Sequence, residues 1–294
     1  MSKIAYNMSG DSMDGFLFIN KPKGMTSHDV VYRVKKQLKI QKIGHTGTLD
    51  PFATGLLILC LGKATKLSDY ITQQDKSYEG TILFGTHTDT FDITGNILNK
   101  VDVGLLEKDI LNGMRHFTTT YDQRPPNYSA IKVDGQKSYD MARKGATFTL
   151  ETRSVSIYDF KAISPYEDQH IDFYVHVSKG TYIRSLVVDL AKHLGTIATL
   201  NTLKRTSIGA YSLDLAKDLS HVTEEDIYPL ETYLERYEKL ILSPYLIHLV
   251  KNGIYLDARQ IKTDQPFVVY DEEGHMIAFY DVCGNHTYKP VLIL

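Results

Sequence analysis

The hydrophobic and polar positions along the chain predict an interleaved series of strands and helices. Short apolar runs predict strands at residues 15–19, 56–61, 81–84, 154–160 and 171–177. The run 56–61 is continuous and lies between two glycines, which is typical of a strand buried on both faces. Helical spacing predicts one helix after Thr26 and another from Thr181 to Leu194. Because these elements lack βαβ order, we expect an α/β (α+β) fold with a mixed sheet rather than a doubly wound one.

The pattern changes toward the end of the chain. One or two helices with acidic outer faces are predicted up to about Leu240. From about residue 249 short β runs follow, at residues 266–270, 276–280 and 288–294. We therefore expect a larger domain of residues 14–245 and a small β domain of residues 246–294. Residues 1–13 are mostly polar and patternless, so we expect a leader or a flexible N-terminus there.

Composition narrows the class of protein. The 294 residues are 43% hydrophobic and 23% charged, which predicts a globular chain with a sizeable core. Cys60 and Cys283 lie far apart, and this predicts neither a disulfide scaffold nor a zinc site. No apolar run reaches the length of a membrane span, and no secretory signal pattern is found. We therefore expect a cytoplasmic protein without membrane contact.

Charge is distributed unevenly although the net charge is only −2. Residues 21–46 hold seven Lys or Arg against one acid, whereas residues 222–239 hold six acids against two basic residues. A basic lobe on a near-neutral protein is compatible with contacts to a phosphate backbone. The alternative is an ordinary solvated helix face.

The most informative candidate for chemistry is Asp50, within the glycine-punctuated segment 44–55. An apolar strand follows this segment at once, so we expect the carboxylate at the rim of a rigid sheet. The alternative is that Asp50 only caps a turn before Pro51. Arg184 is predicted in the first turn of a helix, where the helix dipole disfavours a cation. We therefore expect a carboxylate partner for Arg184, and Asp50 is the candidate. The alternatives are that Arg184 pairs with Asp189 or lies in solvent.

Three further patterns have a functional and an ordinary interpretation. Tyr78 follows a lysine at a strand start and could stack on a base, or simply pack in the core. Residues 55–63 end like a phosphate loop, but the glycine spacing and Ala64 argue against one. Residues 87–92 include His and Asp, yet a turn rich in side-chain caps is favoured over a metal site.

Taken in order, the motifs of the chain resemble those of the bacterial tRNA pseudouridine-55 synthases, the TruB family. The resemblance runs from about Gly15 to Ser212. It is carried by residues 21–27 (KPKGMTS), 44–55 (GHTGTLDPFATG), 62–66 (GKATK), 76–78 (KSY), 88–95 (TDTFDITG), 123–130 (QRPPNYSA), 178–184 (SKGTYIR) and 203–206 (LKRT). Each motif is short, but the ordered set is specific. The C-terminal β segment is similar, more weakly, to the PUA-like RNA-binding domain.

The resemblance implies a pseudouridine synthase fold, with a mixed, mostly antiparallel sheet flanked by helices. It implies an RNA-gripping insert at about residues 123–152 and a PUA-like domain at residues 246–294. The activity implied is that of an isomerase that converts uridine 55 in the T-loop of tRNA to pseudouridine, with base flipping. No cofactor and no metal are expected. tRNA is the expected partner, and we expect a monomer without an obligate protein partner.

The resemblance also implies roles for single residues. Asp50 matches the family's catalytic aspartate, and Arg184 matches the arginine that keeps it ionised. The residues expected to support or bind the substrate are Tyr78, which stacks on the flipped uracil, His45, which fills the vacated space in the RNA, Leu203, an apolar wall, and Lys21 and Tyr182.

Two rival functions remain open at this point. One is a non-catalytic RNA-binding or RNA-folding protein on the same scaffold, against which the presence of Asp50 argues. The other is a glycosidase-like hydrolase, which usually needs two carboxylates around the scissile bond, whereas the Asp50 segment offers one. Contact between Asp50 and Arg184 beside Tyr78 is the observation that would support the predicted site.

Overall fold

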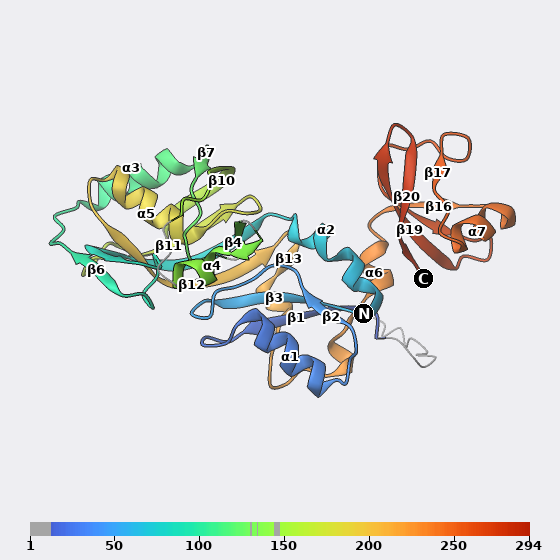
Figure 1. Cartoon of the computed structure of the whole chain (residues 1–294), viewed down its shortest axis with the longest axis horizontal. Coiled ribbons are helices and arrows are strands. Elements are labelled where there is room, and N and C mark those ends of the chain that lie inside the picture. The colour runs from blue at the N-terminus through green and yellow to red at the C-terminus, as the bar shows by residue number, and fades with distance from the viewer. Residues whose placement is uncertain (1–12, 130, 134, 144–147) are drawn as a thin grey trace.

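The computed structural model describes residues 13–129, 131–133, 135–143 and 148–294. Apart from residue 13, the predicted leader lies outside the described residues. So do residues 130, 134 and 144–147 of the predicted insert. The molecule is elongated, with a large sheet at one end and a smaller sheet, which contains the C-terminus, at the other (Figure 1).

The large sheet has 11 strands within the described ranges. Its main path runs β14 (Lys217–Asp218), β1 (Gly15–Lys21), β3 (Thr54–Leu61), β12 (Ala198–Ile208), β4 (Lys76–Phe84), β11 (His170–Val177), β10 (Arg153–Ala162) and β7 (Thr120–Gln123). The remaining strands pair with β3, β12 and β1: they are β2 (Ile43–His45), β13 (Tyr211–Ser212) and β15 (Tyr228–Pro229). Only the pairs β1–β14 and β3–β12 are parallel. The predicted mixed, mostly antiparallel sheet is confirmed.

Strand β3 is buried on both faces, as its continuous apolar run predicts. Leu56, Ile58 and Cys60 point into one core cluster, and the alternate residues Leu57, Leu59 and Leu61 point into another. Side chains alternate across a strand, so one short strand serves two cores. Because this strand follows the Asp50 segment directly, it gives that segment a fixed base.

Helices cover the sheet through these cores. Helix α1 (Ser27–Gln37) begins at a Thr26 cap, where Asp29 completes a capping box, and it packs on β1 and β3. Helices α3 (Glu107–Phe117) and α5 (Ile183–His193) pack on the half of the sheet that contains β4 and β10–β12. The predicted starts of α1 and α5 are confirmed, each within two residues.

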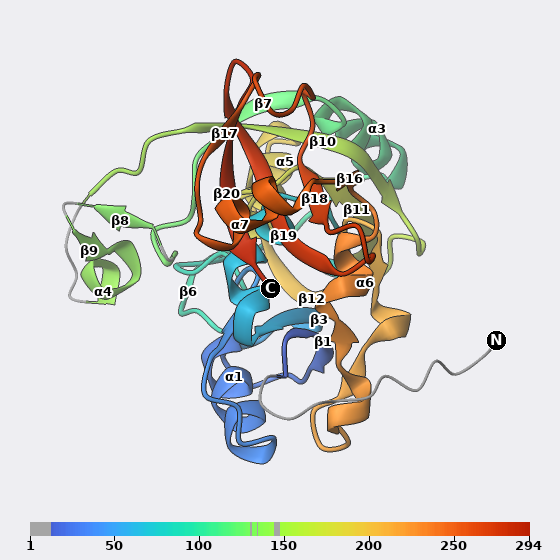
Figure 2. The ribbon, with the colours of Figure 1, turned by 90° about the vertical axis from the view of Figure 1, so that its right-hand side faces the viewer.

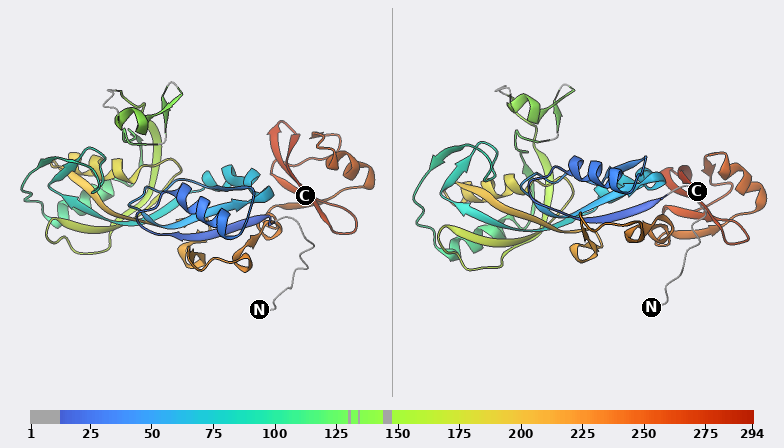
Figure 3. Two further views of the ribbon diagram at one scale, coloured as in Figure 1. Left: turned by 60° about the horizontal axis from the view of Figure 1, so that its bottom comes forward. Right: turned by 90° about the horizontal axis from the view of Figure 1, so that it is seen from below.

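Shorter elements connect these parts. They are the 3₁₀ helices η1 (Gly62–Leu67), η2 (Leu213–Leu215) and η3 (Glu224–Asp226), the helices α2 (Ser68–Thr72) and α6 (Leu230–Leu234), and the hairpin of β5 (Thr86–Thr88) and β6 (Ile97–Lys100). The insert between β7 and β10 contains β8 (Lys132–Val133), β9 (Gln136–Lys137) and α4 (Ser138–Arg143). It stands out from the body of the molecule (Figures 2 and 3).

The small sheet runs β16 (Glu238–Ile241), β18 (Phe267–Tyr270), β19 (Met276–Gly284), β20 (Thr287–Ile293) and β17 (Leu256–Asp257), and α7 (Pro244–Lys251) packs against it. The predicted β runs at residues 266–270, 276–280 and 288–294 are confirmed. The predicted helix up to about Leu240 is wrong at its end. Residues 238–241 instead pair in parallel with β18, because Leu240 packs against the apolar core of the small sheet. The boundary at residue 246 stays a prediction.

The two sheets are joined by an apolar contact. One core cluster includes Phe279 and Leu292 of the small sheet together with Phe16 and Leu67 of the larger part. The Tyr70 hydroxyl also donates a hydrogen bond of 2.6 Å to Asp281. The small sheet is therefore packed against the body of the protein rather than tethered by a linker.

Gly55 at the start of β3 has no room for a side chain. Its φ is +101°, and a Cβ would lie 2.3 Å from the carbonyl oxygen of Arg205. Gly55→Ala should lower the free energy of unfolding by about 2–5 kcal/mol, since it adds backbone strain to a steric clash. Urea unfolding measures this change. The matched control Gly104→Ala, with no atom within 4 Å of the added Cβ, should change it by less than about 0.5 kcal/mol.

Candidate active site

The segment that carries Asp50 connects β2 to β3 and is fixed from several sides. The Ser27 hydroxyl accepts a hydrogen bond from the Leu49 N–H at 2.9 Å. On the other side of Asp50, the Pro51 carbonyl accepts from the Gly24 N–H at 2.7 Å. The start of α1 and the turn before it therefore hold the residues on both sides of Asp50.

Lys21 lies beneath this segment and not at the surface. Its side chain is fully buried, and Nζ donates to the carbonyls of Pro22 at 3.0 Å and Met25 at 2.7 Å, with the Pro51 carbonyl at 3.5 Å. Burial lowers the pKa of Lys21 to about 8, although the nearby Asp50 opposes this shift. We expected Lys21 to contact the substrate. In the structure its ammonium group instead binds carbonyls of the turn and of the Asp50 segment.

A second buried cation, Arg205, was not identified from the sequence as part of the site. It is 1% exposed and donates to the Leu56 carbonyl at 2.7 Å and the Gly47 carbonyl at 3.2 Å. Burial lowers the pKa of Arg205, and the nearby Tyr78 opposes that shift. Arg205 pairs across the sheet with both Gly55 and Tyr78, so this row of residues connects the Asp50 segment to β4.

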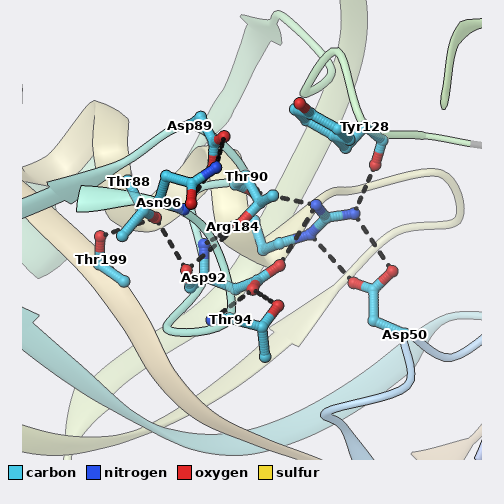
Figure 4. Close-up of polar contacts among 10 residues, drawn as sticks. All are labelled: Asp50, Thr88, Asp89, Thr90, Asp92, Thr94, Asn96, Tyr128, Arg184 and Thr199. Atoms are coloured by element: carbon cyan, nitrogen blue, oxygen red, sulfur yellow. Dashed lines mark hydrogen bonds and ion pairs between the residues drawn. The ribbon is translucent and has the colours of Figure 1, made fainter. Parts of the chain in front are cut away.

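Asp50 and Arg184 form a two-point ion pair (Figure 4). Arg184 Nε lies 3.0 Å from Asp50 Oδ2, and Nη2 donates to Oδ1 at 3.2 Å. Paired contacts of this kind fix both the distance and the plane of the carboxylate. The predicted pairing is confirmed, and the alternative partner Asp189 instead accepts a hydrogen bond from Tyr121.

Arg184 has three further partners. Nη1 lies 3.5 Å from Asp92 Oδ2 and donates to the Thr90 carbonyl at 3.0 Å. Nη2 also donates to the carbonyl of Tyr128 in the insert at 2.9 Å. The guanidinium thus joins Asp50, the turn after β5 and the insert. Figure 4 shows these groups surrounding Arg184.

Asp92 belongs to the turn that the sequence predicts to be rich in side-chain caps. That prediction is confirmed, since Asp92 accepts from the Thr94 N–H at 3.0 Å and Asp89 accepts from the Asn96 N–H at 2.8 Å. The contact between Asp92 and Arg184 was missed. A capping acid and an acid that pairs with a distant arginine have the same local sequence, so no signal in the sequence separates them.

The exposure of the ion pair is asymmetric. The Asp50 side chain is 33% exposed, whereas that of Arg184 is 6% exposed. The carboxylate therefore reaches the surface while its partner stays hidden. Burial raises the pKa of Asp50, and the charge of Asp92 adds to the shift, while Arg184 and Lys21 oppose it. The ionisation of this carboxylate is thus set by a balance between desolvation and two cations.

Two predicted residues belong to the core cluster that begins beside Asp50. Tyr78 on β4 and Leu203 on β12 are each 7% exposed and belong to the same core cluster as Leu49. Leu49 precedes Asp50 directly, so the cluster adjoins the carboxylate. The cluster also includes the buried apolar residues of α5, the helix that carries Arg184.

His45 and Tyr182 lie at the ends of elements around the site. His45 is half-buried at the end of β2, and its Nδ1 is buried without a hydrogen-bond partner among the residues that the structure describes. Burial lowers the pKa of His45, with Arg205 adding to the shift, which favours the neutral imidazole. Tyr182 is the N-cap of α5, two residues before Arg184, and the Arg153 guanidinium lies 5.4 Å from the centre of its ring.

One group within the described ranges has the spacing of metal ligands. Asp271, Glu273 and His275 offer ligand atoms within 4.8 Å of one another, in the turn between β18 and β19. His275 Nδ1 already contacts Asp271 at 3.1 Å, and such exposed acidic groups are common without an ion. Every helix within the described ranges is too short or too polar to cross a bilayer.

Comparison with known proteins shows the family. Residues 35–183 match the family model described as TruB family pseudouridylate synthase (N terminal domain). The tRNA pseudouridine synthase B of Acholeplasma laidlawii is 47% identical over 94% of this chain and 98% of its own length. Those of Onion yellows phytoplasma and Clostridium tetani are 45% and 39% identical, over 95% and 89% of this chain and 99% and 93% of their own lengths.

The fold is also found among solved structures. The crystal structure of a Cbf5-Nop10-Gar1 complex contains a chain that matches with a TM-score of 0.68 and 24% identity, over 93% of this chain and 80% of that one. The family resemblance drawn from the motifs and the predicted pseudouridine synthase fold are both confirmed. The chain belongs to the TruB family of pseudouridylate synthases and is an isomerase.

Proposed function

We propose that the protein converts uridine 55 in the T-loop of tRNA to pseudouridine, with Asp50 as the catalytic aspartate and without a cofactor. The observation that carries this proposal is the two-point contact of the partly exposed Asp50 carboxylate with the hidden Arg184. It is supported by relatives named tRNA pseudouridine synthase B, which align with this chain over nearly their full length.

The reaction breaks the N1–C1′ bond of the uridine, turns the uracil and forms a bond from C1′ to C5. The C5 proton leaves and N1 gains a proton, so the product is an isomer of the substrate. Attack on the sugar, addition to the uracil ring or removal of a sugar proton by Asp50 each requires an ionised carboxylate. Arg184 and Lys21 stabilise that form against the cost of burial.

The target base has to leave its stack before Asp50 can reach it, at a cost of a few kcal/mol. We propose that Tyr78 stacks on the flipped uracil, a contact worth about 1–3 kcal/mol. Leu203 forms the apolar wall beside it. We propose that His45, as a neutral imidazole whose buried Nδ1 has no partner within the described ranges, enters the space that the base vacates. We propose that the ring of Tyr182 contacts the substrate at the rim of the site.

The tRNA body needs phosphate contacts beyond the T-loop. The outer face of α1 has an open hollow of about 620 Å³, lined among others by Tyr32, Arg33 and Lys36. Tyr32 is 65% exposed, so an aromatic ring and two cations face solvent together. We propose that this face, the insert at residues 123–152 and the PUA-like domain at residues 246–294 hold the RNA. Lys21, being buried, is left out of this set.

Tritium release tests the position of the modified uridine. Incubation with a tRNA transcript that contains 5-tritiated uridine should release about one tritium per tRNA, because one uridine loses its C5 hydrogen. A transcript with cytidine at position 55 should release none. Equal release from both transcripts would contradict the assignment to position 55, and free uracil among the products would favour a hydrolase.

The pH dependence should respond to Asp92. The Asp92 charge raises the pKa of Asp50, so Asp92→Asn should lower that pKa. The active, ionised carboxylate would then persist to lower pH, and the acid limb of the rate should move downward. Single-turnover tritium release at saturating tRNA measures this limb. A limb that moves to higher pH would show that Asp92 acts chiefly by orienting Arg184.

A further inference from the structure

Gln123, the last residue of β7, is a buried amide side chain with three hydrogen bonds. It is fully buried, and its Oε1 accepts a hydrogen bond from the Tyr182 N–H at 2.8 Å. Its Nε2 donates to the Tyr182 carbonyl at 3.2 Å and to the Tyr121 hydroxyl at 2.7 Å. The side-chain amide thus binds both the N–H and the carbonyl of Tyr182, as the backbone of a neighbouring strand would.

The partner of this amide is the residue from which α5 begins. Tyr182 is the N-cap of α5 and makes no side-chain capping bond within the described residues, and its own N–H is bound by Gln123. Arg184 follows two residues later, in the first turn. A shift at Tyr182 would therefore be passed on to the guanidinium.

Both ends of the insert meet at Tyr182. Gln123 and Arg153 are cross-strand partners of β7 and β10, at the points where the insert leaves and rejoins the sheet. Gln123 holds the Tyr182 backbone, and the Arg153 guanidinium lies 5.4 Å from the centre of its ring.

The next residues of α5 hold the insert as well. The Ser185 hydroxyl donates to the Arg124 carbonyl at 2.7 Å. Arg184 Nη2 donates to the Tyr128 carbonyl and to Asp50, so one nitrogen serves both the insert and the catalytic carboxylate. The first turn of α5 is thereby attached to the insert on one side and to Asp50 on the other.

We propose that Gln123 is a positioning residue that locks the first turn of α5 to the base of the insert. It couples the placement of the insert to the contact between Arg184 and Asp50. The inference rests on the proposed function, and it adds that RNA held by the insert favours the catalytic geometry. Gln123 contacts neither the base nor Asp50 and acts through Tyr182 and Arg184.

Gln123→Met tests this role, because it keeps the length of the side chain and removes both amide contacts. The single-turnover rate at saturating tRNA should fall by about 10- to 100-fold, the effect of a small misplacement in a catalytic site. The tRNA Kd should change by less than about threefold, because this residue is not at the RNA surface.

A second readout separates positioning from a loss of stability. Within the part of the chain that the structure describes, Arg184 on α5, Asp92 in the turn after β5 and Lys21 on β1 are the charged groups that face Asp50. A displaced Arg184 opposes burial less, so the pKa of Asp50 should rise and the acid limb of the rate should move to higher pH. Ser185→Ala, which removes one contact to the insert, should move the limb the same way and serves if Gln123→Met does not fold.

The control is Tyr121→Phe, which removes the hydroxyl that accepts a hydrogen bond from Gln123 but leaves the contacts of Gln123 with Tyr182. The rate should stay within about threefold of the unmodified protein, and the acid limb should not move. An unchanged limb in both Gln123→Met and Ser185→Ala, or a loss confined to tRNA affinity, would overturn the inference alone. Failure of the unmodified protein to release tritium from tRNA would overturn the proposed function itself.

Discussion

Replacing Asp50 by Asn is expected to abolish tritium release from tRNA while leaving tRNA binding largely intact. Each chemical role considered for Asp50 needs a charged carboxylate, and an amide can neither attack nor accept a proton at neutral pH. The rate should fall by about 10⁴-fold or more, in line with the loss of an essential covalent or acid–base group in other enzymes. Single-turnover tritium release and the tRNA Kd measure the two effects.

A matched control for this variant is Asp189→Asn. Asp189 is a half-buried carboxylate on the same helix as Arg184, and burial also raises its pKa. It accepts one hydrogen bond from Tyr121, which an Asn oxygen can still accept. The rate should stay within about threefold of the unmodified protein. Wild-type activity in Asp50→Asn would show that another group performs the chemistry.

Replacing Arg184 by Lys is expected to lower the single-turnover rate by about 10²-fold, the next largest effect. Lysine keeps the charge but cannot hold two carboxylate oxygens and two carbonyls in one plane. Each lost hydrogen bond to a charged group costs about 1.5–3 kcal/mol, and about 1.36 kcal/mol corresponds to a factor of ten. The pKa of Asp50 should rise as its best cation moves away, so the acid limb of the rate should move to higher pH.

The stability of the Arg184 variant must be measured beside its rate. A single ammonium group cannot replace the contacts of Arg184 with both Asp50 and Asp92, so urea unfolding should show a lower midpoint. A folded Arg184→Lys protein with the wild-type rate and an unmoved acid limb would contradict the role given to the ion pair.

Local patterns predicted those parts of the fold that local physics decides. The run 56–61 indicated a strand buried on both faces, and the Thr26 cap with Asp29 marks the start of α1. Strand β12 was missed, although it lies at the centre of the sheet. Its residues alternate between buried and exposed less regularly than those of β11, and two register shifts interrupt its pairing with β4.

The end of the acidic region shows a second limit. Residues 238–241 continue an acidic, helix-compatible pattern but form strand β16, because β18 offers a free edge about thirty residues later in the chain. That pairing is a tertiary effect, and it outweighs a weak local preference.

The site was predictable where a charge stood in an unfavourable place. Arg184 at the positive end of a helix calls for an acid, and the predicted position of both residues next to strand ends made Asp50 a candidate partner beside Asp189. The burial of Lys21 and of Arg205 was not predicted, because nothing local distinguishes a buried cation that binds carbonyls from one that faces RNA. The part played by Tyr128 depends on its backbone carbonyl, which any residue type would supply.

Nucleoside analysis of tRNA after reaction tests the central claim most directly. The claim is that Asp50, held by Arg184, isomerises a uridine of tRNA. The unmodified protein should yield about one pseudouridine per tRNA at position 55 without free uracil, and Asp50→Asn should yield none under the same conditions. Pseudouridine formed by Asp50→Asn at the wild-type rate, or free uracil from the unmodified protein, would contradict the account.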